Sequence, residues 1–533
     1  MSLLRVPLRS LAACRIGLAS VMLVDLTTRF GEVEIFLSKR GLLPLELQRE
    51  LTSGGSWWTL YAFSDSPVYA WMLLATQLVC TLLLLAGAWT RYATVALWLL
   101  TMSLHVRNPL VNNSGDMLLR MMLFWGMFAP WGACWSLDAV RRRRGGLAPP
   151  GRDAPVWPSV LLPIQVSLVY LVTGWLKLND VWLSGEAMQR VVELDFCVRP
   201  GGRWLAEHPQ WLAPIAACTL WLELLGPIVV WSPWKSASVR VIVVAAFWAL
   251  HLGVEAVMHV GLFGWVSMAA WLVFLPNPFW DRLGDRLGRR TRPSVESSPE
   301  SDNTARHRGA WRWLVTGICG YAMAVALAAN LLDIWRVGAE MATDANGRLL
   351  PGQETETEGG ENLPPTWLVG LLRSGEPAYI DQEWTMFHVP PTRDSWLVAR
   401  ADLESGEQID VLRRGQPWDA TGSPATAREL PSQHWRYYLR RLSFERHRSF
   451  RQRAADVLLE QWNGRHPQRP AVRLTLIEFA QTFGEEGFET RVLASASSTE
   501  STREAASEAN EPLQIDLEGA LDRLNSPDPF APR

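Results

Sequence analysis

Long apolar segments separated by short basic loops run through the sequence from residue 10 to residue 333. A helix needs about 20 mainly apolar residues to cross a bilayer, with a range of about 17 to 25. Nine segments approach this length, so we predict a polytopic α-helical membrane protein with about nine transmembrane helices. The segments are residues 10–30, 67–88, 91–107, 116–136, 158–178, 211–232, 239–257, 260–276 and 311–333.

The composition also indicates that a lipid bilayer surrounds much of the chain. Of the 533 residues, 48% are hydrophobic and only 20% are charged, and 29 are tryptophan. The net charge of −2 hides an asymmetry, because the arginines gather in short loops whereas the acidic residues concentrate toward the C-terminal third. We therefore predict the lipid bilayer as a partner and exclude nucleic acid.

The basic loops predict how the chain is oriented, because short cytoplasmic loops carry an excess of Lys and Arg. A cytoplasmic N-terminus puts five basic segments on the cytoplasmic side. They contain Arg5 and Arg9, Arg91, Arg141 to Arg144, Lys235 and Arg240, and residues 281–292. Nine spans then place the C-terminal region on the outer face of the plasma (inner) membrane. Because Arg15 and Asp25 interrupt the first apolar segment, we interpret it as a retained helix and not as a signal peptide.

Four regions follow from the changes in composition. We expect a transmembrane domain (1–336), a polar linker (337–369), an outer-face α+β domain (370–490) and a disordered tail (491–533) rich in Ser, Ala, Glu and Pro. Within the α+β domain, "SWLVARADL" and "EQIDVLRRG" around "ESG" predict a β-hairpin, "QHWRYYLRRL" and "RQRAADVLLEQW" predict helices, and "AVRLTLIEF" predicts a strand.

Ionisable residues inside the predicted spans need an explanation, because each costs about 2.5–3.5 kcal/mol to insert. Asp116 and Arg120 are four residues apart, which favours an ion pair on one helix face. Glu223 in "LWLELLGP" has no oppositely charged residue nearby in the sequence, so a structural role and a role facing a cavity are both open.

Three of the ionisable residues, two histidines and a glutamate, have the side-chain types of metal ligands. His251, Glu255 and His259 share one helix face, but the first and last lie about 12 Å apart at 1.5 Å per residue, too far to bind one ion together. Hydrogen bonding to a polar ligand or to another helix is favoured over a metal, and we predict no metal site. Five of the six cysteines lie in apolar segments, and only Cys197 lies in a polar loop, where its reactivity stays an open question.

Lys177 ends the apolar segment "WPSVLLPIQVSLVYLVTGWL", and its helical face also carries Tyr170, Thr173 and Gly174. A lysine near a helix end commonly extends its amine to the membrane interface. Its predicted outer position argues against this role, because the other basic loops are cytoplasmic. If the side chain instead points inward, burial favours the neutral amine, which can act as a general base.

Several segments, taken in order, carry a resemblance to a known family. They are "HVRNPLVNNSGDMLLRMMLFWGMFAPWGACWSLD", "YLVTGWLKLNDVWLSGEAM", "HLGVEAVMHVGLFGWVSMAAWL", "DQEWTMFHVPP" and "HWRYYLRRL". From about residue 10 to about residue 465 the chain resembles the HTTM (horizontally transferred transmembrane) proteins, relatives of vitamin K-dependent gamma-carboxylase. In that carboxylase a lysine deprotonates a reduced quinone, and reaction with O2 yields a strong base that removes a γ proton from a protein glutamate, to which CO2 then adds.

The resemblance implies roles for individual residues. Lys177 matches the catalytic lysine when Tyr170 and Gly174 are aligned, and His251 matches a histidine that precedes a Gly-x-Phe segment. Asn112 and Asn113 match an asparagine pair, but Ser114 stands where the carboxylases have a histidine. Because of that departure, the fold transfers from the resemblance more safely than the chemistry. The outer domain, which is smaller than in the animal enzymes, implies a different mode of substrate recognition.

The leading hypothesis is therefore a quinone-dependent carboxylase, a carbon–carbon lyase, that acts on an exported protein. Its catalytic residues would be Lys177, His251 and Asn113, and its cofactor-binding residues Asn112, Tyr170, Gly174 and Glu223. The cofactor would be a reduced quinone of the vitamin K or menaquinol type, with O2 and CO2 as co-substrates. One alternative is a non-catalytic maturation or interaction factor for an exported protein. A transporter ranks third, because no inverted repeat is visible.

Overall fold

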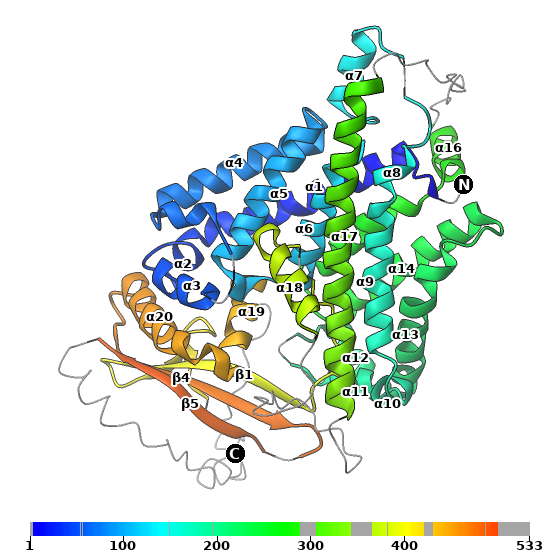
Figure 1. The fold of residues 1–533 in the computed structure, drawn as a ribbon. Helices are drawn as coiled ribbons and strands as arrows, with labels where there is room; N and C mark the ends of the chain where they lie inside the picture. The colour runs from blue at the N-terminus through cyan, green and yellow to red at the C-terminus, as the bar shows by residue number, and fades with distance from the viewer. Residues whose placement is uncertain are drawn as a thin grey trace. The chain divides into compact units, whose positions relative to one another are not determined.

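The computed structural model describes residues 4–287, 305–342, 365–419 and 430–498, apart from residues 54, 56, 149, 196, 381 and 486. The chain forms two compact units (Figure 1). The second unit consists of Arg40–Leu43, Glu193–Cys197 and the chain from Thr392 onward, and the first unit contains the rest. Residues 365–391, most of which we expected in the outer α+β domain, therefore belong with the helices of the first unit.

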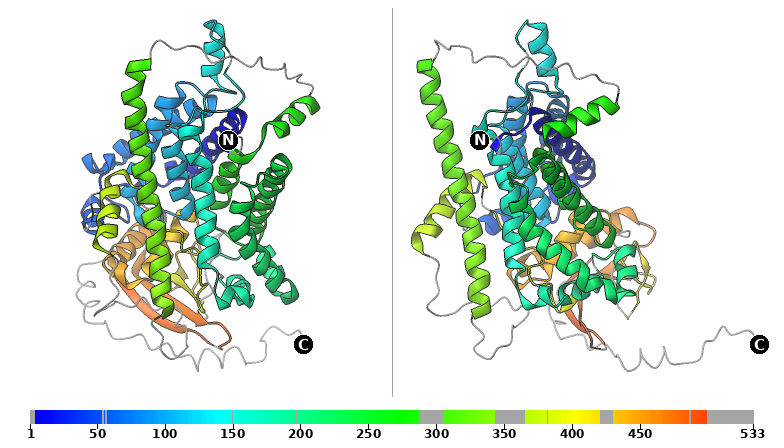
Figure 2. Two further views of the ribbon diagram at one scale, coloured as in Figure 1. Left: turned by 45° about the vertical axis from the view of Figure 1, so that its right-hand side comes forward. Right: turned by 90° about the vertical axis from the view of Figure 1, so that its right-hand side faces the viewer.

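The first unit is built from α-helices of very different lengths. They are α1 (Leu8–Gly31), α2 (Val33–Phe36), α3 (Leu45–Thr52), α4 (Pro67–Ala86), α5 (Thr90–Arg107), α6 (Ser114–Gly126), α7 (Leu137–Arg144), α8 (Val156–Ser159), α9 (Leu161–Leu176), α10 (Asp180–Leu183), α11 (Glu186–Val192), α12 (Pro200–Ala206), α13 (Leu212–Val229), α14 (Ser236–Val257), α15 (Phe263–Trp271), α16 (Asn277–Arg286), α17 (Ala305–Ala342) and α18 (Thr366–Gly375). The long helix α17 runs beside α9 in both Figure 1 and Figure 2.

Five helices among the described residues are long and apolar enough to cross a membrane, and two more apolar helices are shorter. The long ones are Leu8–Gly31, Pro67–Ala86, Pro209–Val229, Ser236–Val257 and Trp313–Trp335, and the shorter ones are Leu161–Leu176 and Phe263–Phe274. A membrane-spanning helical protein is thus confirmed. Each of the nine predicted segments contains a helix, but the number of nine spans and the orientation stay predictions.

The fourth predicted segment, 116–136, is wrong at its C-terminal end, because α6 stops at Gly126. Pro130 cannot donate the backbone hydrogen bond that a continuing helix needs. Gly126 also lets the ring of Trp131 approach closely, since a Cβ atom there would lie 2.1 Å from that ring. The chain therefore turns before Ser136, whose hydroxyl caps α7 by accepting a hydrogen bond from the amide of Ala139 (2.9 Å).

An aromatic core lies where α9, α14 and α15 meet. The rings of Phe247 and Trp271 stack with their centroids 3.9 Å apart, and the ring of Tyr170 lies 4.6 Å from that of Phe247. All three side chains are almost fully buried. This packing fixes the positions of the polar groups that α9 and α14 carry at the same level.

The second unit contains an antiparallel five-stranded sheet with the order β3-β2-β1-β4-β5. Its strands are β1 (Arg393–Leu403), β2 (Gln408–Asp410), β3 (Gln416–Pro417), β4 (Ala471–Thr482) and β5 (Glu489–Ser497), and the helices α19 (Gln433–Leu442) and α20 (Arg451–Arg465) pack against it (Figure 1). The predicted hairpin is confirmed as the β1–β2 pair, and the two predicted helices and the third predicted strand are confirmed as α19, α20 and β4.

Strand β5 occupies residues that we expected to be disordered, from 491 to 497. It pairs with β4 from Ala480↔Glu489 to Arg473↔Ser497, and this long-range pairing gives structure to a segment whose composition indicated none. The rest of the predicted tail, from residue 499, lies outside the described residues. So do residues 343–364 of the predicted linker, whereas α17 continues to Ala342 and α18 begins at Thr366.

Candidate functional site

Lys177 follows the last residue of α9, and its side chain is buried, with 6% of its surface exposed. Its Nζ atom lies 2.5 Å from Oε2 of Glu223 on α13, which is 8% exposed. Nζ also lies 5.0 Å from the ring centroid of Trp182, within the range of a cation–π contact. The amine therefore points into the protein, and Glu223, which lacks a local partner in the sequence, forms an ion pair across two helices.

Gly174 explains how α9 and α13 come close enough for this pair. A Cβ atom at Gly174 would lie 2.8 Å from the backbone nitrogen of Leu224 and 3.0 Å from the carbonyl carbon of Glu223. Only a glycine allows this approach without moving a backbone. The structure thus gives Gly174, expected among the cofactor-binding residues, a packing role directly beneath the ion pair.

Tyr170 and His251 form a second buried polar pair, between α9 and α14. The Tyr170 hydroxyl lies 2.6 Å from Nε2 of His251, and the histidine is 2% exposed. Nδ1 of His251 has no hydrogen-bond partner among the described residues. With the hydroxyl donating to Nε2, the ring proton of a neutral imidazole stands on Nδ1, which leaves one buried donor for a ligand.

Asn112 and Asn113 precede α6, where both side chains hold the backbone. Oδ1 of Asn113 accepts hydrogen bonds from the amides of Gly115 (2.7 Å) and Asp116 (3.3 Å), and Oδ2 of Asp116 accepts one from the amide of Asn113 (2.8 Å), which completes a capping box. Asn112 donates to the carbonyl of His105 (2.9 Å). Nδ2 of Asn113 is buried without a partner among the described residues, so one donor of this side chain is available to a ligand.

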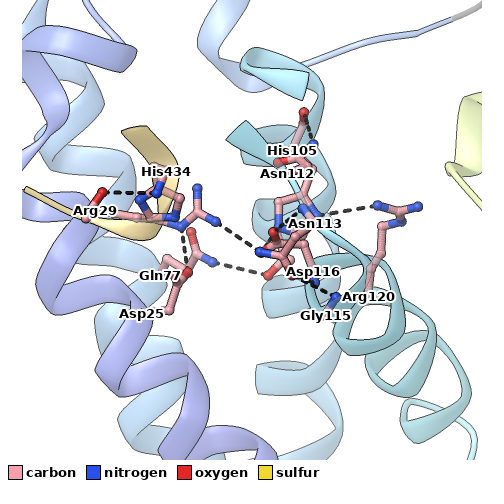
Figure 3. Close-up of polar contacts among 12 residues, drawn as sticks. Asp25, Arg29, Gln77, His105, Asn112, Asn113, Gly115, Asp116, Arg120 and His434 are labelled. Atoms are coloured by element: carbon pink, nitrogen blue, oxygen red, sulfur yellow. Dashed lines mark hydrogen bonds and ion pairs between the residues drawn. The ribbon is translucent and has the colours of Figure 1, made fainter. Parts of the chain in front are cut away.

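Asp116 stands at the centre of a buried charged cluster (Figure 3). Its Oδ1 lies 3.1 Å from Nη2 of Arg29 and 3.4 Å from Nε2 of His105. The pair expected between Asp116 and Arg120 is wrong, because Arg120 donates instead to the carbonyl of Tyr379 (2.7 Å). The spacing along one helix indicated the wrong partner because Arg29, from α1, reaches the carboxylate first.

The start of α15 links the asparagines before α6 with the site around Lys177 and His251. A Cβ atom at Gly115 would lie 2.5 Å from the backbone nitrogen of Phe263, so the first turn of α6 packs directly on this helix. The ring of Phe263 lies 5.7 Å from that of His251. None of the hydrogen bonds of Asn113 reaches Lys177 or His251 within the described part of the chain, so the connection is made by packing.

The remaining members of the His251 face, Glu255 and His259, are joined by Arg199. Its Nη2 atom lies 3.1 Å from Oε2 of Glu255, and its Nε donates to Nδ1 of His259 at 3.0 Å. The guanidinium of Arg199 is thus bound to two of the three residues that were considered as metal ligands, Glu255 and His259. The described residues contain no cluster able to hold a metal. No sequence pattern pointed to Arg199, which directly precedes α12.

A segment that we name the strap, residues 382–391, lies against the end of α9 and the helices that follow it. Its carbonyls accept hydrogen bonds from Asn179 (to His388, 2.9 Å), Trp182 (to Phe387, 2.8 Å) and Arg190 (to Pro390, 2.9 Å). At its other end Gln165 and Gln382 are hydrogen bonded at 2.6 Å. The strap therefore covers Trp182, which itself contacts Lys177.

Comparison with known proteins identifies the family. Residues 5–280, just over half of the chain, match the HTTM domain. The chain belongs to the HTTM family. HTTM domains are membrane domains associated with gamma-carboxylase, and with the apolar helices they identify this chain as an integral membrane protein. All of the candidate residues, from Asn112 to His251, lie within the HTTM match. No solved structure matches the chain.

Proposed function

We propose that this HTTM protein is a quinone-dependent carboxylase that acts on glutamate in an exported protein, with Lys177 as its base. The observation that carries the proposal is the buried pair of Lys177 and Glu223, 2.5 Å apart. Apolar residues of similar volume would commonly be as stable as a buried ion pair. We therefore attribute the pair to chemistry and not to folding.

Proton transfer within the pair would supply the base. A proton that passes from the ammonium of Lys177 to the carboxylate of Glu223 leaves a neutral amine beside a neutral carboxylic acid. The amine can then accept one proton from a donor bound beside it, while Glu223 keeps the first proton until the site is reset. In this scheme Glu223 acts on Lys177, which revises its expected role in holding the quinone.

The cofactor would be a reduced quinone of the vitamin K or menaquinol type. When bound, and with O2, this group would supply the strong base that removes the γ proton of glutamate, to which CO2 then adds. Nδ1 of His251 and Nδ2 of Asn113 fit such a ligand, because both are buried donors without a partner among the described residues. They can hold a quinone oxygen or a developing negative charge in a site with little water. Asn112 and Tyr170 would orient these donors.

The predicted orientation indicates on which side of the membrane a substrate would reach the site. A cytoplasmic N-terminus places the end of α9, and Lys177 with it, toward the outer face of the cell membrane. A protein substrate would then meet the site after export.

The test is incorporation of isotope-labelled CO2 into protein glutamate by membranes that contain this chain, given a reduced quinone and O2. We expect label with the unchanged chain and none with Lys177→Arg. The arginine keeps a cation beside Glu223, but its guanidinium stays protonated and cannot serve as a base. Label that persists in Lys177→Arg would exclude Lys177 as the base.

A double variant separates chemistry from folding. Lys177→Met with Glu223→Leu removes both charges and keeps similar volumes, so the chain should fold about as well as the original. We expect this variant to reach the membrane in normal amounts and to incorporate no label. Either single charge deletion, by contrast, should reduce the amount of folded protein, because it leaves one charge buried alone.

A non-catalytic maturation or interaction factor is the second candidate. Ser114, the first residue of α6, favours it, because the resembling carboxylases have a histidine at this position. On this alternative no quinone supports labelling, and Lys177→Arg leaves the phenotype unchanged. If Ser114→His gained labelling, the result would instead support a carboxylase that lacks only the histidine at this position.

A further inference from the structure

A cavity of about 510 Å³ lies at the end of α9 opposite to Lys177. Its walls come from the start of α5, the turn between α6 and α7, α7 itself, the segment before α9, and α17. Because α9 has 16 residues, its two ends lie about 24 Å apart. The cavity is therefore distinct from the candidate carboxylase site, and the chemistry proposed above does not use it.

The cavity combines an apolar wall with signs of a membrane interface. Phe128, Trp131, Trp157 and Val315 line it. Trp157 is 41% exposed, and its indole donates a hydrogen bond to Thr316 on α17 (3.2 Å). Exposed tryptophans are typical of the level at which lipid headgroups meet the acyl chains. An occupant of this cavity would thus meet both apolar and polar surroundings.

Positive charge gathers at the rim. Arg91 and Arg142 line the cavity, and Arg142 is one of four consecutive arginines in α7. Asp138 also lines the cavity, but its carboxylate accepts hydrogen bonds from the amide (2.8 Å) and hydroxyl (2.7 Å) of Thr90 and lies 3.5 Å from Arg141. Arg142 itself makes no ion pair with any described residue, so its charge is available to an anion.

One buried polar group in the cavity wall lacks a partner among the described residues. Ser159 lines the wall and is only 1% exposed, and its hydroxyl has no hydrogen-bond partner among the described residues. A buried hydroxyl without a partner is unfavourable, and a ligand oxygen that bonds to it would remove this penalty. Arg142 and Ser159 both line the cavity, so each can contribute a polar contact to an occupant.

We propose that this cavity binds the phosphate-containing headgroup of an anionic glycerophospholipid. Arginine pairs with phosphate through strong, charge-assisted hydrogen bonds. Basic pockets between transmembrane helices commonly bind anionic lipid headgroups. The aromatic and apolar wall favours a lipid over a free phosphate ester, because the glycerol backbone and the first acyl carbons can pack against it. The volume is within the usual range for a small-molecule site, about 300–1,000 Å³.

Lipid binding to the purified full chain tests the proposal, with native mass spectrometry as the readout. Phosphatidylglycerol and phosphatidylcholine with the same acyl chains are compared, and glycerol 3-phosphate serves as the free phosphate ester. We expect phosphatidylglycerol to bind more tightly than phosphatidylcholine. Arg142→Gln should weaken it about fivefold, the effect of one basic residue at an anionic membrane surface. Arg143→Gln is the matched control, because this exposed neighbour on α7 does not line the cavity.

A second variant tests the cavity itself. Ala139→Leu places a larger side chain in the wall without changing the charge, and we expect it to reduce phosphatidylglycerol binding as well. Equal binding of the two lipids would overturn the proposal, as would equal effects of Arg142→Gln and Arg143→Gln. Displacement of the lipid by glycerol 3-phosphate at similar concentrations would show that the site takes a free phosphate ester, which also overturns the proposal.

Discussion

The hydroxyl of Tyr170 and Nε2 of His251 lie 2.6 Å apart, between α9 and α14, where the rings of Tyr170 and Phe247 also pack. Replacing Tyr170 by phenylalanine keeps the ring packing but frees the imidazole to change its tautomer and rotate. We expect carboxylation to fall roughly ten- to a hundredfold, by analogy with the loss of groups that orient metal-binding histidines.

The measurement for Tyr170→Phe is the initial rate of labelling, beside the thermal stability of the variant in detergent. The loss of stability should be only about 1 kcal/mol. Tyr321→Phe is the matched control, because it removes an exposed hydroxyl that is hydrogen bonded to Ser374. An unchanged rate in Tyr170→Phe would show that its hydroxyl does not position His251.

Gly174→Ala should separate α9 from α13, since the added Cβ atom would lie 2.8 Å from a backbone nitrogen. Neither helix can yield without moving Glu223 away from Lys177. We expect a loss of about 1–3 kcal/mol, the usual cost of overpacking, and a lower unfolding temperature. Gly253→Ala on α14 meets no atom within 4 Å and should be neutral or stabilising. Equal stability of the two variants would show that the approach of α9 and α13 is not tight.

The raised pKa of Asp410 predicts that the stability of the second unit depends on pH. Burial raises its pKa to about 6, although the amides of Leu412 and Ala399 donate to its Oδ1. The folded chain thus binds this proton more tightly than the unfolded chain, where the pKa is about 3.9. The stabilisation from protonation is complete below that value and is lost as the pH rises through about 6. Lowering the pH from 7.5 to 5 should therefore stabilise this unit.

Hydrogen exchange at the amides of β1 measures this effect. Asp410→Asn keeps an oxygen that can accept from both amides, and it should remove about half of the pH dependence of stability. The other half is expected from Asp394, because burial raises the pKa of that carboxyl to about 6 as well. Glu404→Gln, an exposed position in the hairpin turn, should leave the dependence intact. A pH dependence that is the same in all three proteins would contradict the assignment.

Cys197 should be unreactive in the folded protein. It is 2% exposed, and burial raises the pKa of its thiol to about 12, so almost no thiolate is present near neutral pH. In a variant that keeps only this cysteine, we expect alkylation to be slow in the native state and fast after unfolding. The control places a cysteine at the exposed Ser405. Comparable native rates at the two positions would refute the prediction.

Local pattern was enough to predict most of the helices and much of the sheet. The segment "QHWRYYLRRL" coincides with α19, residue for residue, and "ESG" lies at the turn between β1 and β2. These elements are determined by hydrophobic periodicity and turn residues, which act over a few positions. Where a distant strand supplies the hydrogen bonds, as β4 does for β5, composition alone is misleading.

The candidate site was only partly predictable for the same reason. Burial of the Lys177 side chain was one of two interpretations that the sequence allowed. Its partner, Glu223, lies 46 residues away and could not be identified from spacing. Arg199 likewise reaches Glu255 and His259 from another loop. Intramembrane charges must find opposite charges or hydrogen bonds somewhere, yet which helices meet is decided by packing at positions such as Gly174.

The path of the chain through the second unit affects how this protein can be dissected. Arg40–Leu43 and Glu193–Cys197 belong to that unit, where Arg453 donates to the carbonyl of Gly41 (3.0 Å) and Asp394 accepts from the amide of Asp195 (2.8 Å). The second unit is therefore assembled from three separate stretches of the chain. A stop codon near residue 340 would remove the strap as well, and a faithful domain exchange between relatives would have to transplant three separate stretches of sequence.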